Sequence, residues 1–201
     1  MVSICLNELM KFLKNKMKFT RLSIPDIVLI EPNIYQDDRG YFLESFRLDK
    51  IREFLGYNID FVQDNESKSN LWVFRGLHYQ KPPFTQAKLV RVISGSICDI
   101  VVDIRKNSPN FGQYLKINLD GISKKMLFIP KGFAHGFLTL ENNTIISYKT
   151  DNYYSFEHDS GIAYNDPQIG IDLEFDENKL ILSDKDKTQP MLSDIISPFD
   201  F

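Results

Sequence analysis

Residues 88–104 read KLVRVISGSICDIVVDI, two apolar runs rich in β-branched residues with the turn pair Gly95-Ser96 between them. Valine and isoleucine favour extended backbone, and glycine and serine favour the turn that separates the two runs. The stretch therefore predicts two strands joined by a turn, one over 88–94 and one over 97–104. The remaining elements can be placed outward from these two strands.

Short strands are expected before and after these two at intervals of about 8–12 residues. They cover residues 27–30, 41–45, 61–63, 73–80, 113–118, 125–129, 137–140 and 144–150. Turn-forming residues separate them, for example Asp120-Gly121 and Pro130-Lys131-Gly132. One helix is expected over 49–55, ended by Gly56. Many short strands with regular turns predict an all-β fold, a jelly-roll β-barrel with a few short peripheral helices.

The N-terminal residues 1–16 differ from the rest of the chain. Leu6, Leu9 and Leu13 recur at helical spacing, which predicts a helical extension without recognisable chemistry. From Met17 onward the sequence contains no repeat, low-complexity tract or linker. We therefore expect residues 17–201 to form a single domain.

The composition excludes several classes of protein. The 201 residues are 43% hydrophobic and 25% charged, which is typical of a globular chain. The 24 Lys and Arg against 27 Asp and Glu leave a net charge of −3, so no nucleic-acid partner is expected. No run approaches the ~20 apolar residues of a membrane span, and the N-terminus lacks the features of a secretion signal. Cys5 and Cys98 are interpreted as free thiols in a reducing cytoplasm.

The three histidines are the first candidates for chemistry. His158 lies in a polar loop and is expected at the surface, whereas His78 lies in the strand over 73–80 and His135 in a glycine-rich approach to a strand. For His78 and His135 two interpretations remain: a buried histidine that only makes structural hydrogen bonds, or a functional histidine. The chain has no His-x-His pair, so we expect no metal site. A lone histidine is better suited to act as a base.

A histidine base needs an acidic partner that orients it. Asp186 ends the charged run 182–186, for which a solvated surface is the favoured interpretation. Asp99 and Asp103 share one strand face, and one of them could face a wet barrel interior. Lys88 shares a strand face with valines, so it is expected to point inward or to lie at the barrel mouth.

Arg75 and His78 are three positions apart and would point to opposite sides of an ideal strand. Either a bulge at Gly76 brings both side chains to one face, or the two residues serve different surfaces, such as sites on two subunits. Tyr148 shares a strand face with Ile146. The simplest interpretation is that its ring packs in the core and its hydroxyl makes a hydrogen bond there. Together these residues supply a base, an amine, a guanidinium and a phenol on one barrel.

Several longer motifs follow one another along the chain. They are residues 38–45 (DRGYFLES), 61–65 (FVQDN), 75–80 (RGLHYQ), 88–91 (KLVR), 102–105 (VDIR), 129–137 (IPKGFAHGF) and 148–154 (YKTDNYY). In order and spacing they resemble the dTDP-4-dehydrorhamnose 3,5-epimerase family of the cupin superfamily. The resemblance extends from about Met17 to Asp186.

The resemblance implies a cupin-type jelly-roll barrel and a cofactor-free, cytoplasmic sugar-nucleotide epimerase of lipopolysaccharide or capsule biosynthesis. It also implies a homodimer whose barrels exchange N-terminal strands. By motif position, His78 takes the place of the catalytic base and Asp186 that of its dyad carboxylate. Tyr148 takes the place of the catalytic acid, and Lys88 that of the amine beside the sugar ketone.

Further positions match the family's contacts to the nucleotide and its diphosphate. These are Arg39, Glu44, Gln63, Asn65, Arg75, His135 and Lys185. Asp159 stands where a glutamate is expected in the family, so the match is weaker at this position. Tyr154 is placed among the substrate-binding residues and is the alternative proton donor to Tyr148.

The leading interpretation is epimerisation at C3 and C5 of dTDP-4-dehydro-6-deoxyglucose, which gives dTDP-4-dehydrorhamnose. Residues 84–87 and 155–161 depart from the expected pattern, so the same chemistry on another nucleotide 4-keto sugar, such as a GDP-4-keto-heptose, stays open. A C3-only epimerase is a further alternative, against which Tyr148 counts. A sugar-nucleotide-binding protein without turnover fits less well, because the base, acid, amine and dyad carboxylate positions are all retained. A 3,4-ketoisomerase also fits less well, because the motifs at 75–78 and 148–154 resemble those of the epimerases.

Overall fold

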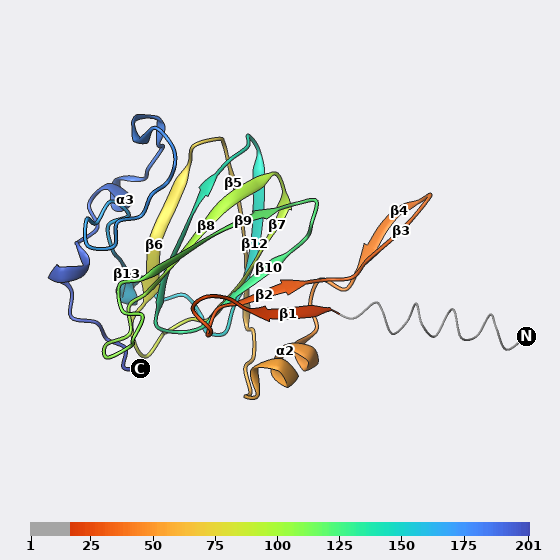
Figure 1. The fold of residues 1–201 in the computed structure, drawn as a ribbon, viewed down its shortest axis with the longest axis horizontal. Helices are drawn as coiled ribbons and strands as arrows, with labels where there is room; N and C mark the ends of the chain where they lie inside the picture. The colour runs from red at the N-terminus through yellow and green to blue at the C-terminus, as the bar shows by residue number, and fades with distance from the viewer. Residues whose placement is uncertain (1–16) are drawn as a thin grey trace, which may run out of the picture.

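The computed structural model describes residues 17–201, and the helical extension expected over 1–16 lies outside the described residues. Two antiparallel sheets pack against each other (Figure 1). In spatial order, the first sheet contains β1 (Lys18–Arg21), β2 (Val28–Glu31), β10 (Met126–Ile129), β7 (Lys88–Ser94), β12 (Thr144–Thr150) and β5 (Gln63–Ser69). The second contains β13 (Asp159–Gly161), β6 (Phe74–Gln80), β11 (Phe133–Thr139), β8 (Ser96–Asp103) and β9 (Tyr114–Asp120).

A third, two-stranded sheet is the hairpin of β3 (Ile34–Asp37) and β4 (Gly40–Leu43), which projects from the body of the molecule (Figure 1). The helical elements are short and peripheral. They are α2 (Leu48–Leu55), α3 (Asp184–Lys187) and the 3₁₀ turns Phe156–His158, Glu177–Lys179 and Leu192–Asp194.

Apolar side chains from both sheets meet between them. The first sheet contributes Val90 and Val92 of β7 and Ile146 of β12, and the second contributes Ile97 and Val101 of β8. All of these side chains are almost completely buried. Removal of apolar surface from water is the main favourable term in folding, so this layer holds the two sheets together.

Both sheets are also covered on their outer faces. Helix α2 packs Ile51 against the first sheet near Phe128. The segment that follows β13 packs side chains such as Leu173 against Ile100 and its neighbours on the second sheet. Strand β8 is therefore buried on both faces, and Asp99 on its inner face lies inside the barrel.

The register between β6 and β11 settles how Arg75 and His78 share a strand. His135 pairs with His78 and Phe137 with Arg75, so Gly76 and Leu77 stand opposite the single residue Gly136. This is a β-bulge. Leu77 packs with Ile100 in the apolar cluster on the outer face of the second sheet. Arg75 and His78 lie on the other face, where Arg75 is exposed and His78 is partly buried. The bulge alternative is confirmed.

Glycine is required at the bulge for two reasons. Gly76 has φ 132°, a conformation that side chains with a Cβ rarely adopt, and a Cβ built there would lie 2.5 Å from the Cα of Gly136. The two backbones can approach this closely only without that carbon.

The all-β jelly-roll prediction is confirmed, and the strands expected over 88–94 and 97–104 are β7 and β8. They do not pair with each other, because β7 belongs to the first sheet and β8 to the second. The expected helix over 49–55 is confirmed as α2, one residue longer at its start and ended by Gly56 in the left-handed conformation. Cys98 is a free, buried cysteine, while Cys5 lies outside the described residues. No helix within 17–201 combines the length and hydropathy needed to cross a membrane.

Three expectations about elements are wrong in their bounds or incomplete. The strand expected over 61–63 is β5, which begins at Gln63 and continues to Ser69. Its more buried side chains are polar, so they give no apolar pattern that marks the strand. The strand expected over 137–140 begins at Phe133, so His135 lies within a strand and not before it. The strand expected over 41–45 is β4, which begins at the turn glycine and ends at Leu43. Strands β1, β3 and β13 and helix α3 were not expected.

Candidate active site

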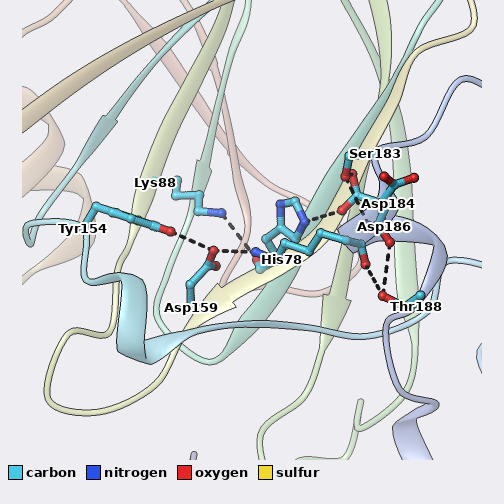
Figure 2. A network of polar contacts seen from close by, with 9 residues as sticks. His78, Lys88, Tyr154, Asp159, Ser183, Asp184, Asp186 and Thr188 are labelled. Carbon is cyan, nitrogen blue, oxygen red and sulfur yellow. Dashed lines mark hydrogen bonds and ion pairs between the residues drawn. The ribbon is translucent and has the colours of Figure 1, made fainter.

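His78 and Asp186 form a hydrogen-bonded pair inside the structure. Nε2 of His78, on β6, lies 2.5 Å from Oδ1 of Asp186, on α3 (Figure 2). Asp186 is only 4% exposed, so the expectation of a solvated surface run is wrong for this residue. The run 184–187 instead forms one turn of helix whose buried side is Asp186. The S-x-x-D pattern that begins at Ser183 is a helix N-terminus signature from which this turn could have been found.

The acidity of Asp186 reflects two opposing effects. Burial raises its pKa, while the hydrogen bonds from His78 and Ser183 and the charge of Lys185 lower it, with a net pKa below the ordinary value. The carboxylate is therefore ionised at neutral pH and can only accept hydrogen bonds. Nε2 of neutral His78 must then carry the proton, which leaves the lone pair on Nδ1.

Lys88 lies beside this pair, as its strand pattern predicted. Its Nζ donates to the carbonyl oxygen of His78 at 3.4 Å (Figure 2). Burial lowers the pKa of Lys88 to about 8, and the charges of Asp99 and Asp159 oppose that shift. The ammonium is thus a cation in a poorly hydrated position next to the histidine.

Asp99 and His135 form a second buried pair, and the sequence did not reveal that they are partners. Both carboxylate oxygens of Asp99 contact Nε2 of His135, at 3.0 and 3.1 Å. Asp99 has no exposed surface and His135 is 7% exposed. Burial lowers the pKa of His135, partly offset by Asp99. Alternation along 97–104 left Asp99 and Asp103 as candidates for the barrel interior, and the pairing of β11 with β8 brings Asp99 to His135.

Tyr148 of β12 faces the interior of the barrel. It packs against the apolar layer between the sheets, and burial raises its pKa above the ordinary value of 10.0. The positive charge of Arg75 acts in the opposite direction and lowers the pKa of Tyr148. The phenol is therefore protonated at neutral pH, on the sheet opposite to the one that carries His78.

Three further candidates lie near one another along the edge of the barrel. The amide of Gln63 donates to Oδ1 of Asn65 at 2.8 Å, and both residues lie on β5 beside β12. Nε of Arg75 donates to Ser69 Oγ at 3.1 Å, which holds the guanidinium toward the same strand. These polar groups therefore accompany Tyr148 on one side of the barrel.

A second cluster of polar side chains is centred on Asp159. The hydroxyl of Tyr154 donates to Oδ2 of Asp159 at 2.9 Å, and Lys185 forms an ion pair with the same oxygen. Burial and the adjacent Asp159 carboxylate raise the pKa of Tyr154. Lys185 lies on α3 directly before Asp186, so through Asp159 this cluster joins the loop that bears Tyr154 to helix α3.

A cleft of about 380 Å³ adjoins this cluster on the side of the C-terminal segment. Its lining combines two lysines with hydroxyl, amide and apolar side chains. It consists of Tyr79, Lys81, Asp159, Ser160, Gly161, Lys185, Thr188, Gln189, Pro190, Ile195 and Ile196. Asp159 and Lys185 therefore stand between the interior of the barrel and this outer cleft.

Arg39 and Glu44 are not brought to these clusters. Arg39 lies at the turn of the projecting hairpin, where its guanidinium contacts Asp37 and the side chain is 90% exposed. Glu44 follows β4 and accepts a hydrogen bond from Arg47 at 3.0 Å. His158, expected at the surface, is half-buried, with Nδ1 2.8 Å from Ser155 Oγ and its ring against Phe84.

The described residues do not assemble a metal site. Within 17–201, no group of three or more His, Cys, Asp or Glu side chains is arranged to hold a metal ion. The nearest approach to a ligand set is the two His–Asp pairs, and in each of them the carboxylate is already engaged by the imidazole. The expectation of a cofactor-free protein stays a prediction.

Comparison with known proteins identifies the family. The sequence model of the dTDP-4-dehydrorhamnose 3,5-epimerase family matches residues 21–194. The chain is 46% identical to the dTDP-4-dehydrorhamnose 3,5-epimerase of Escherichia coli (strain K12). The alignment spans 180 residues, which are 90% of this chain and 97% of that protein.

Solved structures agree with the sequence match. The crystal structure of dTDP-6-deoxy-D-glucose-3,5-epimerase from Legionella pneumophila in complex with dTDP-4-keto-L-rhamnose is similar with a TM-score of 0.85 and 44% identity, covering 89% of this chain and 94% of that one. A 3′-monoepimerase from Streptomyces bikiniensis in complex with dTDP-quinovose has a TM-score of 0.80 and 30% identity, covering 86% of each chain. The chain is thus a jelly-roll protein of an isomerase family. It belongs to the dTDP-4-dehydrorhamnose 3,5-epimerase family, which confirms the resemblance seen in its motifs.

Proposed function

We propose that this protein epimerises dTDP-4-dehydro-6-deoxyglucose at C3 and C5 to give dTDP-4-dehydrorhamnose. The observation that carries the proposal is the His78–Asp186 pair, 2.5 Å apart, with the ammonium of Lys88 beside it. The family of the chain and the ligand of the Legionella pneumophila structure support this choice of substrate.

His78 is the base in this proposal. The hydrogens on C3 and C5 of a 4-keto sugar are acidic because the carbanion is delocalised onto the ketone oxygen. With Nε2 donating to Asp186, Nδ1 is the nitrogen that accepts each hydrogen as a proton. A positioned general base of this kind contributes typically ~10²–10⁴ in rate.

Lys88 stabilises the charge that develops on the ketone oxygen O4. A fixed cation in a water-poor site stabilises an oxyanion more strongly than it would in water, and it needs no reorganisation during the reaction. Lys88 meets both conditions, since burial lowers its pKa to about 8 and its ammonium lies next to the base.

Tyr148 is the acid. Inversion requires that a proton reach the carbon from the face opposite to the base, and Tyr148 belongs to the opposite sheet from His78. Its raised pKa keeps the phenol protonated at neutral pH. Tyr154 is a weaker candidate, because its hydroxyl already donates to Asp159 and the residue is 51% exposed.

The nucleotide and its diphosphate are recognised in this proposal by cationic and polar side chains. Arg75, Lys185, Gln63 and Asn65 are assigned to this contact by family motif, and so is His135, which is buried inside the barrel. A guanidinium fork matches phosphate oxygens in pairs, which suits Arg75 to this role. His135 contacts substrate through Nδ1 in this scheme, since Nε2 is held by Asp99.

A C3-only epimerase is the second candidate, because the Streptomyces bikiniensis relative is described as a 3′-monoepimerase. That relative is 30% identical, whereas the Escherichia coli 3,5-epimerase is 46% identical. The difference favours double epimerisation. Another nucleotide or a longer sugar is the third candidate and keeps the same chemistry.

We also propose a homodimer in which the β3–β4 hairpin crosses to the partner. β1 pairs with β2, and β2 pairs with β10 of the same chain, so the exchange is limited to this hairpin. Tyr41 and Phe42 on it are 58% and 65% exposed, and an isolated two-stranded hairpin is only marginally stable in water. In such a dimer Arg39 and Glu44 reach the partner's site. We place the dimer in the cytoplasm, in the biosynthesis of a rhamnose-containing surface polysaccharide.

The proposal is tested by incubating the protein with dTDP-4-dehydro-6-deoxyglucose in D₂O and counting deuterium in the product by mass spectrometry. Two deuterons per sugar are expected for double epimerisation, and one for a C3-only enzyme. GDP-linked 4-keto sugars serve as the comparison substrates. Binding of the dTDP sugar without any exchange would contradict the proposal and favour a non-catalytic protein.

A further inference from the structure

Ser183 makes two hydrogen bonds to the single residue Asp186. Its hydroxyl donates to Oδ2 of Asp186 at 2.8 Å and accepts from the backbone N–H of Asp186 at 3.1 Å (Figure 2). One hydroxyl hydrogen and the oxygen lone pairs allow both bonds at once. Ser183 is also the residue that precedes α3, so the second bond caps that turn.

The two oxygens of the Asp186 carboxylate therefore have different partners. Oδ1 faces His78 and Oδ2 faces Ser183. A carboxylate on a single short turn can rotate about its terminal bond unless both oxygens are engaged. The contact with Ser183 restricts this rotation and keeps Oδ1 directed at the imidazole.

We propose that Ser183 is a positioning residue of the base: it fixes the carboxylate that fixes the His78 imidazole. The proposal rests on the proposed function, in which His78 is the base. Ser183 acts through Asp186 alone and makes no contact with substrate in this scheme. Its hydrogen bond also lowers the pKa of Asp186 against the opposing effect of burial, so that the carboxylate stays an acceptor.

Capping of α3 is the competing explanation for Ser183, and three substitutions separate it from positioning. Ser183→Thr keeps both the acceptor for the N–H and the hydroxyl donor, and the exposed position leaves room for the methyl group. Ser183→Asp keeps a good capping acceptor but has no proton to donate and sets a second anion beside Asp186. Ser183→Ala loses both. Ser193→Ala, at an exposed serine bonded only to its neighbour Asp194, is the matched control.

The experiment measures kcat, the dTDP dissociation constant and the melting temperature of these variants. Positioning predicts that kcat falls roughly 10- to 100-fold in Ser183→Ala and Ser183→Asp, because a hydrogen bond to a charged group is lost. It predicts that dTDP affinity is unchanged, that Ser183→Thr keeps near-normal kcat, and that Ser183→Asp retains the melting temperature. If Ser183→Asp restores kcat along with the melting temperature, Ser183 is only a cap and the proposal is overturned.

A second readout does not depend on turnover. The ¹⁵N chemical shifts of the His78 ring report which nitrogen carries the proton, and we expect a clean Nε2–H tautomer in the wild type and in Ser183→Thr. Ser183→Ala and Ser183→Asp should show a mixture of tautomers. If the wild type fails to turn over the dTDP sugar, the proposed function fails, while these spectra still decide the role of Ser183. Identical spectra in all four proteins would overturn it.

Discussion

Nε2 of His78 lies 2.5 Å from Oδ1 of Asp186, and the other oxygen of that carboxylate accepts from Ser183 at 2.8 Å. This arrangement determines which ring nitrogen is free for chemistry. Since the pKa of Asp186 lies below its ordinary value, the carboxylate accepts the Nε2 proton and Nδ1 keeps the lone pair. The direction of proton transfer in the proposed reaction follows from this one contact.

Lys88 sets the alkaline limit of activity. Its pKa is lowered to about 8 by burial, and only the ammonium can stabilise the oxyanion. We expect kcat to fall as pH rises through about 8. In Lys88→Arg, whatever its absolute rate, this limb should move beyond pH 10 because a guanidinium stays charged. A wild-type rate that is constant up to pH 10 would assign the oxyanion to another group.

Substitution of Asp99 should shift the alkaline limit of activity that Lys88 sets. The Asp99 charge raises the pKa of Lys88, so Asp99→Asn should move the alkaline midpoint below 8. The substitution also weakens the buried contact to His135, and we expect a loss of about 1–3 kcal/mol in the free energy of unfolding. Urea denaturation and a pH–rate profile measure the two effects. Asp64→Asn, at an exposed carboxylate on β5, is the matched control.

Tyr148→Phe separates removal of the proton from its return. His78 should still exchange C3 and C5 hydrogens with solvent on one face, while inverted product falls by roughly 10²-fold or more because the donor on the other face is missing. Tyr154→Phe should keep inversion. Product stereochemistry measured by NMR distinguishes the two tyrosines, and normal double inversion in Tyr148→Phe would transfer the role to Tyr154.

Chelators should leave turnover unchanged. The proposed chemistry uses an imidazole, an ammonium and a phenol of the chain, and within 17–201 the acidic and imidazole groups do not cluster as ligands. The measurement is kcat before and after prolonged dialysis against EDTA. Loss of activity that returns with one divalent ion would require a different mechanism.

The sequence predicted those parts of the fold that depend on local apolar patterns. Alternation indicated that Lys88 points inward or lies at the barrel mouth and that Asp99 or Asp103 could face the interior. The two apolar runs around these residues are the strands β7 and β8, but which sheet each one joins could not be inferred locally. Strand β5 was missed beyond Gln63 because polar inward side chains give no hydrophobic signal. Asp186 was placed at the surface because a charged run gives no indication of burial, although the S-x-x-D signature was available.

The partners within the site depend on contacts between distant segments. The pairing of β11 with β8 brings Asp99 to His135, and no local pattern reports that register. The bulge at Gly76 was open to two interpretations until the offset between β6 and β11 was known. Residue types and strand faces can thus be inferred locally, whereas hydrogen-bond partners require the tertiary structure.

Deuterium exchange in His78→Asn tests the central claim most directly, that one histidine removes both protons. The variant and the wild type are incubated with dTDP-4-dehydro-6-deoxyglucose in D₂O, and His158→Asn serves as the matched control. We predict that His78→Asn takes up no deuterium at C3 or at C5 while it binds dTDP with near-normal affinity. Retained exchange at either carbon in a folded His78→Asn protein would contradict the account and require a second base.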